Sequence, residues 1–186
     1  SRYLAPHYVA AALILALGVS DPVSPVRGIL WALVVVAVAV GVPLVVLRRE
    51  LLLGKISDWH ISDRHERLQV VPIAALVLAS GLPALLLYAF HGPRSLMVVC
   101  LSGAALTVLS MVITLCWKVS LHVSSIAAST ALMAGVLGAP AAPVLLLIPL
   151  VAWARIKVGA HTVMQTVVGG VVGAGIAWGV LHALGV

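Results

Sequence analysis

The chain has 186 residues, of which 63% are hydrophobic and only 9% carry a formal charge. Globular domains average about 25% charged residues, so this composition excludes a soluble globular domain, a disordered tail and a conventional nucleic-acid binder. The short alternating pattern of a membrane barrel is absent too, which predicts an all-α bundle of transmembrane helices. The net charge of +6 suggests a phosphate-bearing partner or an anionic surface of membrane lipids.

Long uncharged stretches separate the charged residues, and about 20 apolar residues suffice to cross the hydrocarbon core of a bilayer. These stretches predict a polytopic bundle of six to seven spans, forming one integral-membrane domain over residues 1–186. The candidate spans are residues 3–20, 28–47, 70–90, 95–117, 119–138, 141–154 and 162–184. The sixth is the shortest, because its 14 residues rise only about 21 Å, and it lengthens to 18 residues if counted from Pro140 to Lys157.

Turn-forming residues mark the connections between the spans. Pro and Gly in residues 21–25, 91–94 and 138–143 cannot continue a helix comfortably. If the spans cross alternately, one end of the bundle holds the N-terminus and residues 48–69, 117–122 and 154–161. We call this end face one. The three Pro-containing turns lie at the other end, which we call face two. Nine of the 11 Lys and Arg residues lie on face one, which the positive-inside rule makes cytoplasmic in a cell membrane.

Three polar clusters, far apart in the sequence, are predicted to meet on face one. The clusters are residues 55–67, residues 118–122 and residues 155–165. Ionisable groups at helix ends that face one pocket of a membrane protein are a functional hypothesis by default. The candidate side chains are Lys55, Arg64, Lys118, Ser120, His122, Arg155, His161 and Gln165.

The third cluster carries a spaced pattern, in which Ala154-Arg155 is followed by five residues, His161, three residues and Gln165. It resembles the Ser-Arg-x5-His-x3-Asp motif of the type 2 phosphatidic acid phosphatase (PAP2) superfamily, which includes lipid phosphatases and vanadium haloperoxidases. The other two motifs of that family, Lys-x6-Arg-Pro and Pro-Ser-Gly-His, precede this one in the same order as the two remaining clusters.

The two earlier clusters match the family less closely. The second keeps Ser120 and His122 but neither the Pro nor the Gly of Pro-Ser-Gly-His. In the first, eight residues separate Lys55 from Arg64, and His65 replaces Pro. The order of the three clusters and their shared face support the resemblance more than any single match does.

The resemblance implies a PAP2-like helical core and a metal-independent lipid phosphatase without a cofactor. Its substrate would be the phosphate monoester or diphosphate of a polyprenyl or glycerolipid. His161 would attack phosphorus to form a phosphohistidine that water then hydrolyses, and His122 would protonate the leaving group. The groups expected to hold the phosphoryl oxygens are Lys55, Arg64, Ser120 and Arg155. Lys118, which the family motif does not name, is expected to add positive charge at the phosphate site.

Gln165 stands where the family places an Asp. Residues at i and i+4 share a helix face, so Gln165 is predicted to reach His161 and to fix its tautomer. An amide supplies no negative charge, and the related Asp-to-Asn change in a serine protease costs about 10⁴ in rate. A carboxylate from the first cluster is the expected substitute, with Asp58, Asp63 and Glu66 as candidates.

Two other classes of function remain open at this point. A Mg²⁺-dependent prenyl or CDP-alcohol transferase would use Asp58, Asp63 and Glu66 as oxygen ligands, and chelation would abolish its activity. A non-enzymatic bundle would bind or transport lipid, or would hold a haem between His122 and His161 and be coloured.

Residues outside the clusters are expected to serve the fold. His7, His91 and His182 are predicted to be structural or to face solvent. Five glycines near the C-terminus suit close helix packing in membranes, and four of them form the Gly-x3-Gly pairs 169/173 and 175/179. The five are Gly169, Gly170, Gly173, Gly175 and Gly179.

Overall fold

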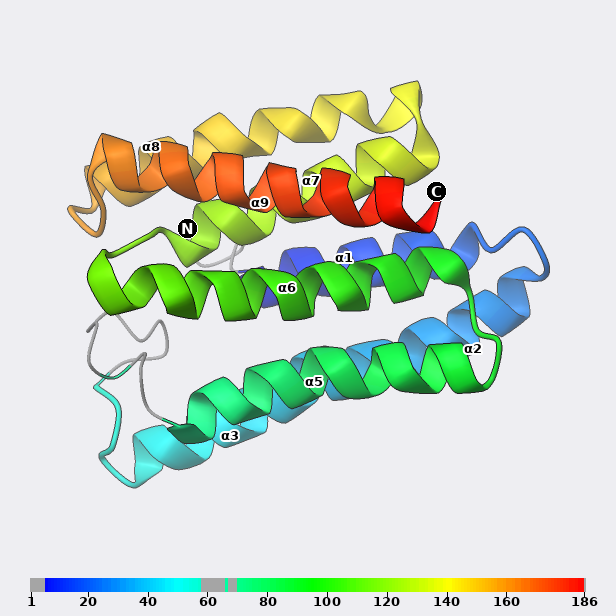
Figure 1. Cartoon of the computed structure of the whole chain (residues 1–186), viewed down its shortest axis with the longest axis horizontal. Helices are drawn as coiled ribbons and strands as arrows, with labels where there is room; N and C mark the ends of the chain where they lie inside the picture. Colours follow the sequence, from blue (N-terminus) through cyan, green and yellow to red (C-terminus); the bar gives the residue numbers. More distant parts are fainter. Residues whose placement is uncertain (1–5, 58–65, 67–69, 186) are drawn as a thin grey trace.

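The computed structural model describes residues 6–57, 66 and 70–185, and these form helices joined by short turns, with no β-strand among them. The described residues make seven helical rods that run in alternate directions between the two ends of a bundle (Figure 1). In chain order the rods are α1 (Pro6–Val19), α2–η2–α3 (Pro25–Val36, Ala37–Gly41, Val42–Leu52), α5 (Val70–Ala89), α6 (Arg94–Cys116), α7 (Leu121–Leu137), η3–α8 (Ala139–Leu146, Leu147–Lys157) and α9 (Val163–Leu184).

Four stretches of helix are long and apolar enough to cross a membrane, namely Pro25–Leu52, Arg94–Cys116, Ala139–Lys157 and Val163–Leu184. Three shorter apolar helices accompany them: His7–Val19, Ala74–Ala89 and Leu121–Leu137. Large apolar side chains point outward around the bundle, as expected where lipid replaces water; Leu30, Val45 and Trp178 are 60, 70 and 73% exposed. The described residues therefore confirm an all-helical fold with four helices long and apolar enough to span a membrane, whereas six to seven crossings and a PAP2-like core remain predictions.

Two predicted spans have different boundaries in the structure. The second, predicted over residues 28–47, covers Pro25–Leu52. It begins early because Ser24 caps the helix and Pro is well suited to the first helical position, and it ends late because α3 continues through Arg48, Arg49 and Glu50. The sixth, predicted over residues 141–154, covers Ala139–Lys157, since a 3-10 turn carries Pro140 and Pro143 into α8. Arg155 consequently lies inside the last turn of α8, where it is buried.

The chain alternates between the two ends as predicted. Figure 1 shows the α3 end, the α6–α7 junction and the α8–α9 junction at the left end of the bundle, which is face one. The α1–α2, α5–α6 and α7–η3 turns and the C-terminus lie at the right end, which is face two. The second and third polar clusters therefore share one end of the molecule.

Helices α7 and α9 pack closely through glycine. A Cβ atom on Gly173 would lie 2.1 Å from the Ser124 carbonyl oxygen, and one on Gly169 would lie 2.9 Å from the Ser120 carbonyl oxygen. Only glycine allows the backbones of α7 and α9 to approach this closely, and the Gly-x3-Gly spacing predicts such close packing. Gly175 and Gly179 take no part in this contact, because nothing lies within 4 Å of a Cβ atom at either position.

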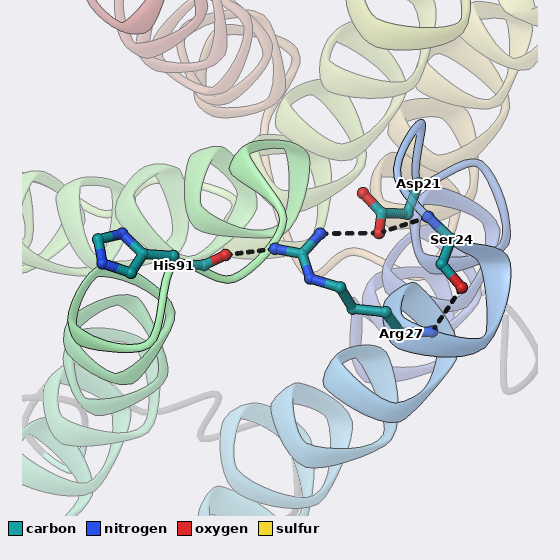
Figure 2. Close-up of polar contacts among 4 residues, drawn as sticks. All are labelled: Asp21, Ser24, Arg27 and His91. Carbon is teal, nitrogen blue, oxygen red and sulfur yellow. Dashed lines mark hydrogen bonds and ion pairs between the residues drawn. The ribbon is translucent and has the colours of Figure 1, made fainter.

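The Arg27 side chain links two turns on face two, through an ion pair to one and a hydrogen bond to the other. The Arg27 guanidinium lies between the carboxylate of Asp21 in the α1–α2 turn and the backbone carbonyl of His91 in the α5–α6 turn (Figure 2). Its Nη1 atom is 3.0 Å from Asp21 Oδ2, and the Asp21 side chain is only 2% exposed. His91 thus contributes its carbonyl oxygen to the structure, in line with a structural role for this residue.

Candidate functional site

The second cluster leads into α7 on face one. Trp117 ends α6 in an extended conformation, and Ser120 is the N-cap residue of α7, which places His122 in the first turn of that helix. Ser120 is completely buried, yet its side chain makes no capping hydrogen bond. Its Oγ atom has no hydrogen-bond partner among the described residues. A buried hydroxyl at a helix N-terminus is well placed to donate to an anion.

A tight turn links the third cluster's Arg155 to its His161. The Ala160 N–H donates to the Arg155 carbonyl at 3.1 Å, and the Gly159 N–H donates to the Ile156 carbonyl at 2.9 Å. This bond pattern is the Schellman motif, which requires a left-handed residue, and Gly159 has φ +68°. Arg155 and His161 are thereby held on either side of one helix-ending turn.

A backbone hydrogen bond joins the second cluster to the third. The Ser120 N–H donates to the Gln165 carbonyl at 3.3 Å, where α7 and α9 both begin. Gly169 continues the close approach one turn farther along α9. Four polar residues of the two clusters are buried here, with exposed fractions of 0% for Ser120, 8% for His122, 8% for Arg155 and 7% for His161.

Gln165 fixes the orientation of the His161 ring. Its Oε1 atom accepts the Thr162 N–H at 3.2 Å, and since a backbone N–H can only donate, the amide must present its oxygen at this position. The same oxygen lies 3.1 Å from His161 Nδ1, so Nδ1 must carry the hydrogen of that bond. Neutral His161 is then the Nδ1–H tautomer, whose lone pair is on Nε2.

Thr162 is a site residue that sequence reasoning missed. It caps α9, and its side chain accepts the Gln165 N–H at 3.3 Å while Gln165 bonds back to the Thr162 backbone. The sequence does contain the signal, because Thr-x-x-Gln before an apolar helix is a capping box. The capping box explains why Gln165 points toward the start of α9 and hence toward His161.

The described acids of face one form bonds elsewhere. Glu50 is 1% exposed and pairs with Arg49 at 2.8 Å and with Lys55 at 3.6 Å. Glu66, one of the expected substitutes for the family Asp, accepts from the Ser57 N–H and hydroxyl at 2.9 and 3.1 Å. The acceptor described at His161 Nδ1 is Gln165 itself. The other two candidates, Asp58 and Asp63, lie outside the described residues.

Not every predicted phosphate-binding residue joins this group. Lys55 follows the end of α3, beside Glu50, and its side chain is 52% exposed. In Figure 1, α6 lies between this end of α3 and the α8–α9 junction. Lys118 directly precedes the buried Val119 and Ser120 and is half-buried. Arg64 lies outside the described residues. Of the predicted site residues, those that the structure places at the α7–α9 end of face one are Ser120, His122, Arg155, His161 and Gln165.

Residues 6–57, 66 and 70–185 contain no group of three His, Cys, Asp or Glu side chains that could hold a metal ion. The acidic set of the transferase alternative includes Asp58 and Asp63, so this observation does not test it. What the described residues offer at this end of the bundle is a buried arginine, two buried histidines and the buried Ser120 hydroxyl. Such a group is suited to an anion.

Comparisons of the chain with known protein families, with curated proteins and with solved structures found no match. Function must therefore be argued from the residues of this site. The observations with most weight are the Ser120–Gln165 contact and the oriented His161 ring.

Proposed function

We propose that the protein is an integral-membrane lipid phosphatase that hydrolyses the phosphate monoester or diphosphate of a lipid without a metal ion. The observation that carries this proposal is the hydrogen bond from Ser120 to the Gln165 carbonyl, because it brings the His122 and His161 clusters to one place on face one. The motif resemblance to the type 2 phosphatidic acid phosphatases supports the same chemistry.

His161 is the proposed nucleophile. With Nδ1–H held by Gln165, the lone pair of the neutral ring is on Nε2, which is the atom proposed to attack phosphorus. As the N–P bond forms, the bond from phosphorus to the lipid or diphosphate oxygen breaks, and His122 gives that oxygen a proton. Water then attacks phosphorus and releases inorganic phosphate, with His122 accepting the proton of the water.

The phosphoryl oxygens are proposed to lie against Arg155 and the Ser120 hydroxyl. Arg155 is buried in the last turn of α8, and a guanidinium fork matches phosphate geometry. The N-terminus of α7 adds the favourable end of a helix dipole. Lys118, next to this end, adds positive charge, and the predicted contributions of Lys55 and Arg64 require the first cluster to approach the phosphate.

A lipid is the proposed substrate because the site lies at the end of apolar helices, where phosphate headgroups lie in a bilayer. Polyprenyl phosphates and phosphorylated glycerolipids both place a phosphate at this level above an apolar chain. The positive-inside rule places face one on the cytoplasmic side of the cell membrane.

The test is a phosphate-release assay on the purified protein in detergent with EDTA present, over a panel of polyprenyl and glycerolipid phosphates. The wild-type protein should release phosphate from at least one of them. His161→Ala should lower the rate at least 10³-fold, because no other group supplies the nucleophile. The matched control is His182→Ala, at the exposed far end of α9, which should retain full activity.

His122→Ala should reduce the rate most for substrates with poor leaving groups, because these depend most on protonation of the departing oxygen. The rate should also fall at both low and high pH, since one histidine must be neutral and the other protonated. Activity that EDTA abolishes would instead favour the transferase. A lipid phosphate that binds and is recovered uncleaved would indicate a binding protein.

A further inference from the structure

An open groove runs along α7, α8 and α9 from the level of the candidate site toward the middle of the bundle. Its volume is about 500 Å³. Each of the three helices contributes lining residues that begin within one turn of a site residue: Val123 follows His122, Thr166 follows Gln165, and Ala152 precedes Arg155 by three positions. The other lining residues are Ile148, Pro149, Val167, Gly170, Val171 and Ala174.

The groove offers an apolar surface. Thr166 is its one residue with a polar side chain, and the Thr166 hydroxyl donates to the Val163 carbonyl at 2.7 Å within its own helix. Val123, only 1% exposed, forms the floor. Nothing along these walls matches a polar ligand, whereas a hydrocarbon chain can pack against them by van der Waals contact.

The groove also opens sideways, toward the surroundings of the bundle. Val167 and Val171 on its α9 wall are 53 and 68% exposed. From Thr166 to Ala174 the wall rises about 12 Å along the helix axis, at 1.5 Å per residue. A lipid chain can therefore enter from the bilayer and lie along the groove while its headgroup remains on face one.

We infer that this groove binds the hydrocarbon chain of the same lipid whose phosphate reaches His161. The inference rests on the proposed function and extends it, because it makes chain length a determinant of substrate choice. Long-chain lipid phosphates gain contact with α8 and α9 that short-chain phosphates cannot make. The groove thus selects and aligns the substrate, while the buried polar group carries out the chemistry.

Gly170 allows the groove to be filled without disturbing the helices. A Cβ atom there would lie 3.8 Å from Val123 Cγ1 and 4.0 Å from Ile148 Cγ2, which is ordinary van der Waals contact. The variant Gly170→Leu therefore places a side chain in the groove, and Gly170→Ala tests whether the position tolerates substitution. Gly175→Leu is the matched control, because Gly175 is on the same helix with nothing within 4 Å of its added Cβ.

The measurement is kcat/KM for phosphate release from a series of alkyl phosphates of increasing chain length, in one detergent. For the wild type, kcat/KM should rise with chain length. Gly170→Leu should lose about tenfold on the longest chain, because its side chain takes the place of the lipid chain in the groove, and little on the shortest. Gly170→Ala and Gly175→Leu should follow the wild type. Equal losses on all chains, or equal losses in both Leu variants, would overturn the inference.

A second measurement does not depend on hydrolysis. A long-chain alkyl phosphonate, which resists cleavage, would carry a photoreactive diazirine on its chain and be crosslinked to the purified protein. Labelled peptides should map to α8 and α9 in the wild type, and Gly170→Leu should remove the label whereas Gly175→Leu should not. Labelling that is equally strong without the phosphonate group would assign the groove to bulk lipid and overturn the inference. Specific labelling without any phosphatase activity would retain the groove and reject the proposed function.

Discussion

Both ends of the bundle bury ionisable side chains, but the Asp21–Arg27 pair on face two and the candidate site on face one differ in the kind of side chain that is buried. On face two, the buried carboxylate of Asp21 is neutralised by Arg27, which also donates to the carbonyl of His91 (Figure 2). On face one, Glu50 is also buried and paired, with Arg49 and Lys55, but the buried candidate site residues Arg155, His122 and His161 are basic or neutral. The described acids of that end, Glu50 and Glu66, bond to other residues.

This contrast separates a structural charge from a functional one. Burying an ion pair costs desolvation that its attraction roughly offsets, so a complete pair holds two turns in register and leaves nothing to bind a ligand. A buried group of basic side chains with an unpartnered hydroxyl, that of Ser120 among the described residues, is suited to an anion from outside. Substitutions of the Asp21–Arg27 pair on face two should therefore alter stability, and substitutions of the buried polar side chains of the candidate site on face one should alter binding and turnover.

The largest effect is expected where the two helices of face one meet. Gly173→Ala would place a Cβ atom 2.1 Å from the Ser124 carbonyl oxygen, and neither backbone can yield without separating α7 from α9. We expect a loss of about 3 kcal/mol in the free energy of unfolding, measured by thermal unfolding in detergent, together with loss of phosphatase activity. Gly175→Ala on the open side of α9 should change neither, and similar losses in both variants would argue against the tight α7–α9 contact.

On face two, Asp21→Ala should lower the free energy of unfolding by about 2 kcal/mol. The buried carboxylate that pairs with Arg27 is lost, and the effect is moderated because the Arg27 side chain is 31% exposed. In the double variant with Arg27→Ala, the two losses should be less than additive, which thermal unfolding of all four proteins measures. Phosphate release by the folded fraction should equal that of the wild type; a specific loss of turnover would break the contrast between the two ends.

On face one, Gln165→Glu should raise the rate of phosphate release about tenfold or more. A carboxylate in place of the amide can accept the same bonds from Thr162 and His161 and would stabilise the imidazolium that forms as His161 attacks. Glu also suits the N3 position of a capping box, so stability should not fall. Gln165→Leu should lower the rate, because the ring loses its Nδ1 partner; a Glu variant no faster than the wild type would contradict the assigned role of His161.

Much of the fold could be predicted because long uncharged, apolar stretches identify helices of this kind from composition alone. Uncharged stretches and Pro-containing turns located the rods and their two ends to within a few residues. The errors arose where charged residues or a proline belong to a helix, and α3 includes Arg48, Arg49 and Glu50. Pro25 is at the first helical position, where a missing N–H costs nothing, and Pro140 lies in the 3-10 turn that extends α8.

The site could be predicted only in part. The i, i+4 spacing gave the His161–Gln165 contact, which is local and follows from helix geometry. The pairing of Glu50 with Lys55 and of Glu66 with Ser57 did not follow, because residues 48–69 offer many charged groups and composition does not select among partners. The groove between α8 and α9 is not encoded in any motif, since it depends on how far apart the helices lie.

The α5–α6 turn offers the smallest and most specific prediction. The Gly92 N–H donates to the Leu87 carbonyl and the His91 N–H to the Tyr88 carbonyl, so the turn has the Schellman pattern with His91 as its left-handed residue, at φ +52°. His91→Gly removes the steric cost of that conformation and keeps the backbone carbonyl that Arg27 contacts, so the free energy of unfolding should rise by about 0.5 to 1 kcal/mol. Thermal unfolding should show this gain, and phosphate release should be unchanged. Gly159→Ala, at the equivalent turn of face one, should instead lower the free energy of unfolding and shift His161 relative to Arg155, because Gly159 is also left-handed. A loss of stability in the His91 variant would mean that its side chain, rather than its backbone, holds the turn on face two.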